Sequence, residues 1–198
     1  CFQGCTKLTM IELPRSIESI GDYAFSGLSL DRLVIPNSVK SIGIGCFANT
    51  VINKTFRFPQ GITELSSNCF ERAIIPSTDF IKNVEVIGDN CFNVRSKNES
   101  LPEYLILPKI KHIGEFAFDD EKKTKVFELP SSLTFIGNCA FNSTADDLKI
   151  ICLSIVPFKL SNGAFHGISD NASLFIPKGT KIIYEHSSMV NIYKYCRV

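Results

Sequence analysis

Hydrophobic and polar positions along the chain return in one short phrase: an apolar residue, Gly, two variable positions, a small residue and Phe. The phrase is written IGDYAF, IGIGCF, IGDNCF, IGEFAF and IGNCAF, with looser copies in LSSNCF and LSNGAF. Its final residue recurs every 22–26 residues, at Phe2, Phe25, Phe47, Phe70, Phe92, Phe118, Phe141 and Phe165. A period in the low twenties, held over most of the chain, predicts a solenoid whose units are successive turns of one coil.

Short strands are predicted in the half of each unit that precedes the phrase. The segments MIELP, RLVIP, TFRFP, YLILP and VFELP alternate along their length and end at proline. Alternation with a period of two is typical of a strand with one buried face, and proline ends such a strand. Phe80-Ile81 and Leu153-Ser154 take the same position without proline. A further apolar pair that follows this position in most units predicts another stretch facing the core.

The glycine of the phrase is predicted to form a sharp corner in the coil. It stands at Gly21, Gly43, Gly88, Gly114 and Gly137, and serine replaces it at Ser66 and Ser161. A residue without Cβ adopts a positive φ at the least cost, so we expect a positive φ to be favoured at this corner.

The small residue and the Phe that close the phrase predict two columns through the core. The small residue is always Ala or Cys, and the next residue is always Phe. If the units stack in register, the small side chains form a tight column and the rings form an aromatic column. Neighbouring strands would lie about 4.8 Å apart, so the stack would be a rod on the order of 40 Å long.

The repeat resembles that of the BspA-like leucine-rich repeat family of bacterial surface and secreted proteins, whose units run approximately LP-x-SV-x-x-IG-x-x-AF-x-x-C-x-x-L-x-x-I-x. The resemblance covers nearly the whole chain and is clearest at residues 13–25 and 129–141. It implies a right-handed coil of about eight units of 22–26 residues with short parallel strands. It also implies a solenoid over residues 1–176 and a C-terminal cap over residues 177–198. Because the chain opens inside a unit, we expect it to be truncated at its N-terminus.

Composition narrows the choice of partners. With 198 residues, of which 44% are hydrophobic, the chain is long enough for one continuous stack. Its 21 Lys and Arg nearly cancel its 20 Asp and Glu, which argues against nucleic acid as a partner. No apolar run approaches the roughly 18 residues of a membrane span, so we expect no membrane insertion.

Eight cysteines raise the question of disulfides. Five occupy positions that the family repeat fills with small residues: Cys1, Cys5, Cys46, Cys69 and Cys91. On successive turns such side chains would lie about 4.8 Å apart, beyond the usual Cβ separation of roughly 3.5–4.5 Å in a disulfide. We therefore expect free thiols that pack as small hydrophobic residues. The pairing of Cys139, Cys152 and Cys196 stays open, and no C-x-x-C motif indicates a metal site.

The sequence contains no pattern that indicates catalysis or a cofactor. The three histidines, His112, His166 and His186, lie in different units at unrelated positions. No nucleophile elbow, phosphate-binding loop or H-E-x-x-H motif occurs. We therefore expect neither an enzyme nor a resident cofactor or metal.

The outward strand positions are the candidate binding surface, because alternation turns them away from the core. Those two residues before the proline position are Glu12, Val34, Arg57, Asp79, Ile106, Glu128, Cys152 and Phe175. Those four residues before it are Met10, Arg32, Thr55, Ser77, Tyr104, Val126, Ile150 and Ser173. Apolar side chains gather in the later units and predict a partner-binding strip, composed of Tyr104, Ile106, Val126, Glu128, Ile150 and Phe175. The alternative is that solvent-facing positions vary freely.

The family resemblance implies a function in recognition. BspA-like proteins are associated with host-associated microbes, with adhesion to host matrix proteins and with coaggregation. We therefore expect a non-catalytic interaction module of a secreted or cell-surface bacterial protein, whose ligand is a protein or glycan on host matrix or on other cells. Its signal or anchor would lie outside this sequence. The alternative is a structural spacer that projects another module.

Overall fold

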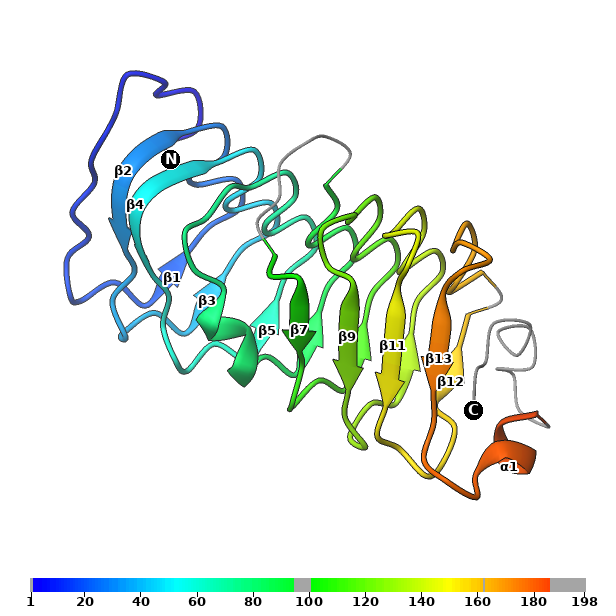
Figure 1. The fold of residues 1–198 in the computed structure, drawn as a ribbon. Helices are drawn as coiled ribbons and strands as arrows, with labels where there is room; N and C mark the ends of the chain where they lie inside the picture. The colour runs from blue at the N-terminus through cyan, green and yellow to red at the C-terminus, as the bar shows by residue number, and fades with distance from the viewer. Residues whose placement is uncertain (1, 95–100, 162, 186–198) are drawn as a thin grey trace.

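Two rows of short parallel strands follow the axis of the molecule (Figure 1), in a computed structural model that describes residues 2–94, 101–161 and 163–185. The chain forms a β-solenoid of about 7 turns, with repeats of ~23 residues and little helix. The predicted fold class is therefore confirmed, and the number of turns is close to the predicted number of units.

The long-strand row forms one face of the solenoid. It consists of β2 (Ser29–Val34), β4 (Val51–Arg57), β7 (Tyr104–Ile106), β9 (Val126–Leu129), β11 (Lys149–Cys152) and β13 (Ser173–Phe175). β2 pairs with β4, and the sheet β7-β9-β11-β13 follows after an interruption. These pairs are parallel, as expected when each strand belongs to one turn of a coil. The predicted strand MIELP contributes only an isolated bridge between Met10 and Arg32.

The short-strand row consists of strands of two residues each. They are β1 (Ser19–Ile20), β3 (Ser41–Ile42), β5 (Glu64–Leu65), β6 (Val86–Ile87), β8 (His112–Ile113), β10 (Phe135–Ile136) and β12 (Lys159–Leu160). They pair in the sheets β1-β3 and β5-β6-β8-β10-β12. The second residue of each strand is apolar and, except for the half-buried Leu160, is buried in the core.

The aromatic column is a continuous element of the core, and its prediction is confirmed. From Phe2 to Phe165, the ring centroids of consecutive units lie 5.0–5.8 Å apart, with interplanar angles of 3–17°. Backbone hydrogen bonds hold the same register: the N–H of Phe47 donates to the carbonyl of Cys69 at 2.9 Å. The N–H of Phe118 donates in the same way to Ala140 at 2.9 Å. Each unit is thus fastened to the next at the turn that carries the ring.

The corner glycine serves a different purpose from the predicted one. The φ angle is not in the positive range at Gly43, Gly88, Gly114 or Gly137, so that expectation is wrong. Positive φ values occur two residues later, as at Asn90 with 54°. A Cβ at each of these four glycines would lie 2.5–2.6 Å from a backbone nitrogen of the preceding unit. The absence of a side chain therefore allows two backbones to approach closely.

The long-strand row is interrupted where the sequence predicted another strand. Ile74 forms an isolated bridge to β4, and two residues later Pro76 cannot donate a ladder hydrogen bond. The chain then enters the 3-10 helix η1 (Asp79–Asn83). Ser77 and Asp79 are therefore not outward strand residues, and that part of the prediction is wrong.

A short helix, α1 (Lys181–Glu185), lies after the last strand. Its Tyr184 is buried, and the phenol donates a hydrogen bond to the carbonyl oxygen of Ser154 at 2.7 Å. Residues 186–198 lie outside the described part of the chain. The division into a solenoid over residues 1–176 and a cap over residues 177–198 therefore stays a prediction.

The cysteines of the small column are free thiols, as predicted. Free cysteines among the described residues are Cys5, Cys46, Cys69, Cys91, Cys139 and Cys152, whereas Cys1 and Cys196 lie outside this part. Cys139 and Cys152, whose pairing the sequence left open, are thus unpaired here. Burial raises the pKa of Cys46 and of Cys91 to about 12, because a thiolate is poorly solvated in the core.

We expect Gly114→Ala to destabilise the protein by roughly 1–3 kcal/mol, the usual cost of overpacking. Its Cβ would lie 2.6 Å from the backbone nitrogen of Asp89 in the preceding unit. Gly21→Ala is the matched control, because the Cβ at Gly21 has no atom within 4 Å. Urea unfolding measures both variants. Equal stabilities for the two would contradict the role assigned to the corner glycine.

Alkylation of the native protein at pH 8 should distinguish the core thiols from the exposed one. We expect iodoacetamide to modify the exposed Cys5 and to leave Cys46 and Cys91 unmodified, because their pKa of about 12 keeps them protonated and burial excludes the reagent. In urea, all three should react. Peptide mass spectrometry reads the sites, and native modification of Cys46 at the rate of Cys5 would contradict this prediction.

Candidate functional site

The predicted partner-binding strip lies on the sheet β7-β9-β11-β13. Tyr104, Ile106 and Phe175 have exposed fractions of 44%, 43% and 40%. Val126 and Glu128 are half-buried between them on β9. These five residues belong to β7, β9 and β13, and the strand register places them on the same outward surface of the sheet.

The sixth predicted member of the strip, Ile150, points into the core instead. Its exposed fraction is 2%, and it pairs with the buried Phe127 of β9. Cys152 is likewise 2% exposed, so its predicted outward orientation is also wrong. The phase of alternation in β11 is shifted by one residue from the predicted phase, and such a shift exchanges the two faces of a strand.

Lys149 and Ile151 are the outward residues of β11 that the sequence reasoning missed. In register, Ile151 lies between Glu128 and Phe175. The available signal was Lys149 itself, because lysine is rarely buried. Alternation counted from that lysine turns Ile151 outward and Ile150 inward. The corrected row across the four strands is Ile106, Glu128, Ile151 and Phe175.

A hydrogen bond joins the polar and aromatic members of this surface. The Tyr104 hydroxyl donates to Glu128 Oε2 at 2.5 Å, from β7 to β9. This bond raises the pKa of the Tyr104 phenol, because ionisation would lose the bond and place two anions together. The carboxylate thus has a hydrogen-bond partner within a largely apolar surface.

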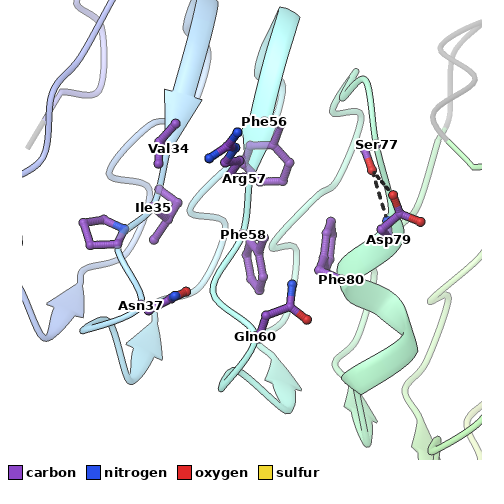
Figure 2. Close-up of a pocket in the computed structure, with 11 residues that line it drawn as sticks. Val34, Ile35, Asn37, Phe56, Arg57, Phe58, Gln60, Ser77, Asp79 and Phe80 are labelled. Atoms are coloured by element: carbon purple, nitrogen blue, oxygen red, sulfur yellow. Dashed lines mark hydrogen bonds between the residues drawn. The ribbon is translucent and has the colours of Figure 1, made fainter.

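Two shallow depressions lie at the other end of the long-strand row. One, of about 410 Å³, is lined by residues of β2 and β4 and by the segment that enters η1 (Figure 2). The other, of about 330 Å³, lies between residues 10–15 and β2. Both are lined by Val34 and Pro36, so the two depressions adjoin, and together they extend over four successive units. We call this feature the N-terminal groove.

The histidines do not come together in a site. The ring of His112 stacks on that of Phe135 with a centroid distance of 4.7 Å, His166 is exposed in another turn, and His186 lies outside the described residues. Within the described ranges, there is no group of three His, Cys, Asp or Glu side chains that could hold a metal ion. The same part of the chain contains no helix that is long and apolar enough to cross a membrane.

A comparison with models of protein families agrees with the repeat. A family model described as BspA type Leucine rich repeat region, in 6 copies, matches residues 1–99 and 96–193. A search of curated proteins found no match. The crystal structure of the pneumococcal vaccine antigen PcpA is similar at 18% sequence identity and a TM-score of 0.40. The alignment covers 86% of this chain and 57% of that one, so this chain spans a little more than half of the antigen's length.

Replacing Glu128 with Gln should lower the pKa of Tyr104 toward the ordinary value of a tyrosine. The hydrogen bond to the carboxylate is the largest cause of the raised pKa of Tyr104. The neutral amide oxygen accepts a weaker hydrogen bond than the carboxylate, and it also removes the charge repulsion that opposes ionisation. Phenolate absorbance measured against pH, compared with that of Tyr104→Phe, isolates this one tyrosine. An unchanged Tyr104 titration in Glu128→Gln would contradict the assigned coupling.

Proposed function

The chain belongs to the BspA-type leucine-rich repeat family, and on that premise we propose that it is a non-catalytic interaction module of a secreted or cell-surface bacterial protein. It binds protein or glycan ligands on host matrix or on other cells through the outward surface of β7, β9, β11 and β13. The family membership confirms the resemblance inferred from the sequence. Leucine-rich repeats generally mediate protein binding, which supports the general class of function.

One observation carries the choice of surface: apolar side chains are exposed together on a paired sheet. Tyr104, Ile106 and Phe175 are each at least 40% exposed, and Ile151 lies between them in register. A contiguous exposed apolar patch on a soluble protein often marks an interface. Tyr and Phe are also enriched in the buried centres of interfaces.

The sheet presents these side chains with little freedom to rearrange. The four strands are hydrogen-bonded in continuous register, and the inward residues Leu105, Phe127, Ile150 and Leu174 are buried beneath them. A ligand that docks here therefore loses less free energy to ordering of the protein than it would on a mobile loop. This favours a recognition surface over freely varying solvent-facing positions.

Replacing Ile106 with Lys should weaken ligand binding roughly tenfold or more while the fold is retained. The substitution places a charge within the apolar surface, on its edge strand β7, where burial in an interface would require desolvation of that charge. The measurement is a binding screen of the purified protein against immobilised matrix proteins and glycans, followed by titration of any saturable ligand.

Ile44→Lys is the matched control. Ile44 is 44% exposed, close to the 43% of Ile106, but it lies in the corner turn after β3 and away from the strip. Circular dichroism and urea unfolding should be the same for both variants. Saturable binding that Ile44→Lys and Ile106→Lys retain equally would refute the proposed surface, and absence of any ligand would favour the spacer function instead.

A further inference from the structure

The N-terminal groove differs in chemistry from the apolar strip. Three arginines line it: Arg15 and Arg32 in the smaller depression, and Arg57 in the larger one. All three side chains are exposed. Among the described residues, none of the three takes part in a salt bridge or a side-chain hydrogen bond. The groove therefore presents to solvent three guanidinium groups that have no partner within the described residues.

Two carboxylates also line the groove, but one of them is already engaged. Asp79 accepts from Lys82 Nζ at 3.2 Å and from the Ser77 hydroxyl at 2.9 Å. These contacts lower the pKa of Asp79. Glu12 is the other carboxylate and has no such contact within the described residues. Positive charge therefore prevails, and an anionic partner complements it.

The larger depression also lies beside an unpaired strand edge. Ile52 N–H donates to the carbonyl of Ile74 at 2.8 Å, and no backbone hydrogen bond joins the later part of β4 to residues 75–83. The backbone of Arg57 is directed toward β2, because its carbonyl oxygen accepts a hydrogen bond from the N–H of Ile35, the residue that follows β2. Alternation therefore turns the backbone N–H and C=O of Phe56 away from β2, toward the depression. Such an edge is a template for an added strand.

We propose that the N-terminal groove binds an extended peptide that carries acidic side chains. Its main chain hydrogen-bonds to the open edge of β4, and its carboxylates pair with the guanidinium groups of Arg32 and Arg57. The planar fork of arginine matches a carboxylate in two parallel hydrogen bonds. Addition of a peptide strand to a sheet edge is an established mode of recognition, in which backbone bonds supply affinity and side chains supply specificity.

The floor of the groove favours a peptide over an acidic glycan. The rings of Phe56, Phe58 and Phe80 line the depression, but they are only 7%, 6% and 5% exposed. Figure 2 shows these rings between β4 and the segment that enters η1. They pack on one another, with Phe58 and Phe80 stacked at 4.3 Å, so they offer no open ring face to a sugar. The polar backbone edge beside them suits a peptide.

This second surface extends the proposed interaction function, and its test is independent of the first. The probe is a fluorescent synthetic peptide that alternates Glu and Val, and binding to the purified protein is followed by fluorescence anisotropy at low salt. The comparison probes are a Lys and Val peptide, the Glu and Val peptide with N-methylated backbone amides, and a polyuronate oligosaccharide. We expect saturable binding of the unmodified acidic peptide only.

The double variant Arg32→Gln, Arg57→Gln should weaken peptide binding roughly a hundredfold, about tenfold for each charge-assisted pair that is lost. The control, Lys159→Gln with Lys178→Gln, removes the same charge from exposed residues outside the groove and should bind almost as the unsubstituted protein does. Ile106→Lys should also bind the peptide normally, so that failure of one surface is distinguishable from failure of the other.

Three results would overturn the proposal. The first is the absence of acidic-peptide binding, or equal binding of that peptide to the arginine double variant and to the lysine control. The second is undiminished binding of the N-methylated peptide, which would exclude strand addition. The third is saturable binding of the polyuronate with the arginine dependence expected of the peptide, which would assign the groove to an acidic glycan.

Discussion

The structure depends on one contact that is repeated along the axis: the stacking of each phrase-ending phenylalanine on the next, fastened by a backbone hydrogen bond. The ring of Phe47 stacks on that of Phe70 at 5.0 Å, and its N–H donates to the carbonyl of Cys69. This contact sets the distance between units at one turn of the coil. Because the turn is close-packed, the residue before Phe is small, and most corners have glycine, where a Cβ would meet the preceding backbone. Where Ser66 takes the corner, its hydroxyl donates to the carbonyl of Ile42 in the preceding unit.

The elements that depend on this contact could be predicted from the sequence, because every unit must stack in the same way and therefore repeats the same residue pattern. Period, strand direction, aromatic column and free core thiols are all consequences of stacking in register. The errors in the strands fall where one residue has no repeated counterpart, whereas the corner glycine was misinterpreted at a repeated position, because positive φ and close backbone approach both favour glycine. Ile150 and Ile151 are both apolar, so the phase of β11 depends on the neighbouring Lys149. Pro76 ends strand pairing in one unit only, and the larger depression of the groove lies where that pairing stops.

The different constraints on inward and outward residues explain why the two candidate surfaces differ. The inward residues must satisfy the stack, whereas the outward ones are constrained by strand pairing alone, so chemistry can change between units without a change of fold. The interruption at η1 separates β2-β4 from β7-β9-β11-β13. On one side of it, Arg32 and Arg57 are exposed, and on the other side Ile106 and Phe175 are exposed.

In a solenoid, each unit contacts only its neighbours, so stability is close to a sum of unit and interface terms. An outward substitution at Ile106 removes no core contact, so we do not expect it to alter the groove at Arg57. The continuous column of rings nevertheless passes beneath both surfaces and fixes their separation. A ligand long enough to reach both would gain affinity from a fixed span, because the second contact would form at a high effective concentration. Independent energetics and fixed geometry together make this repeat suited to displaying separate binding surfaces on one rod.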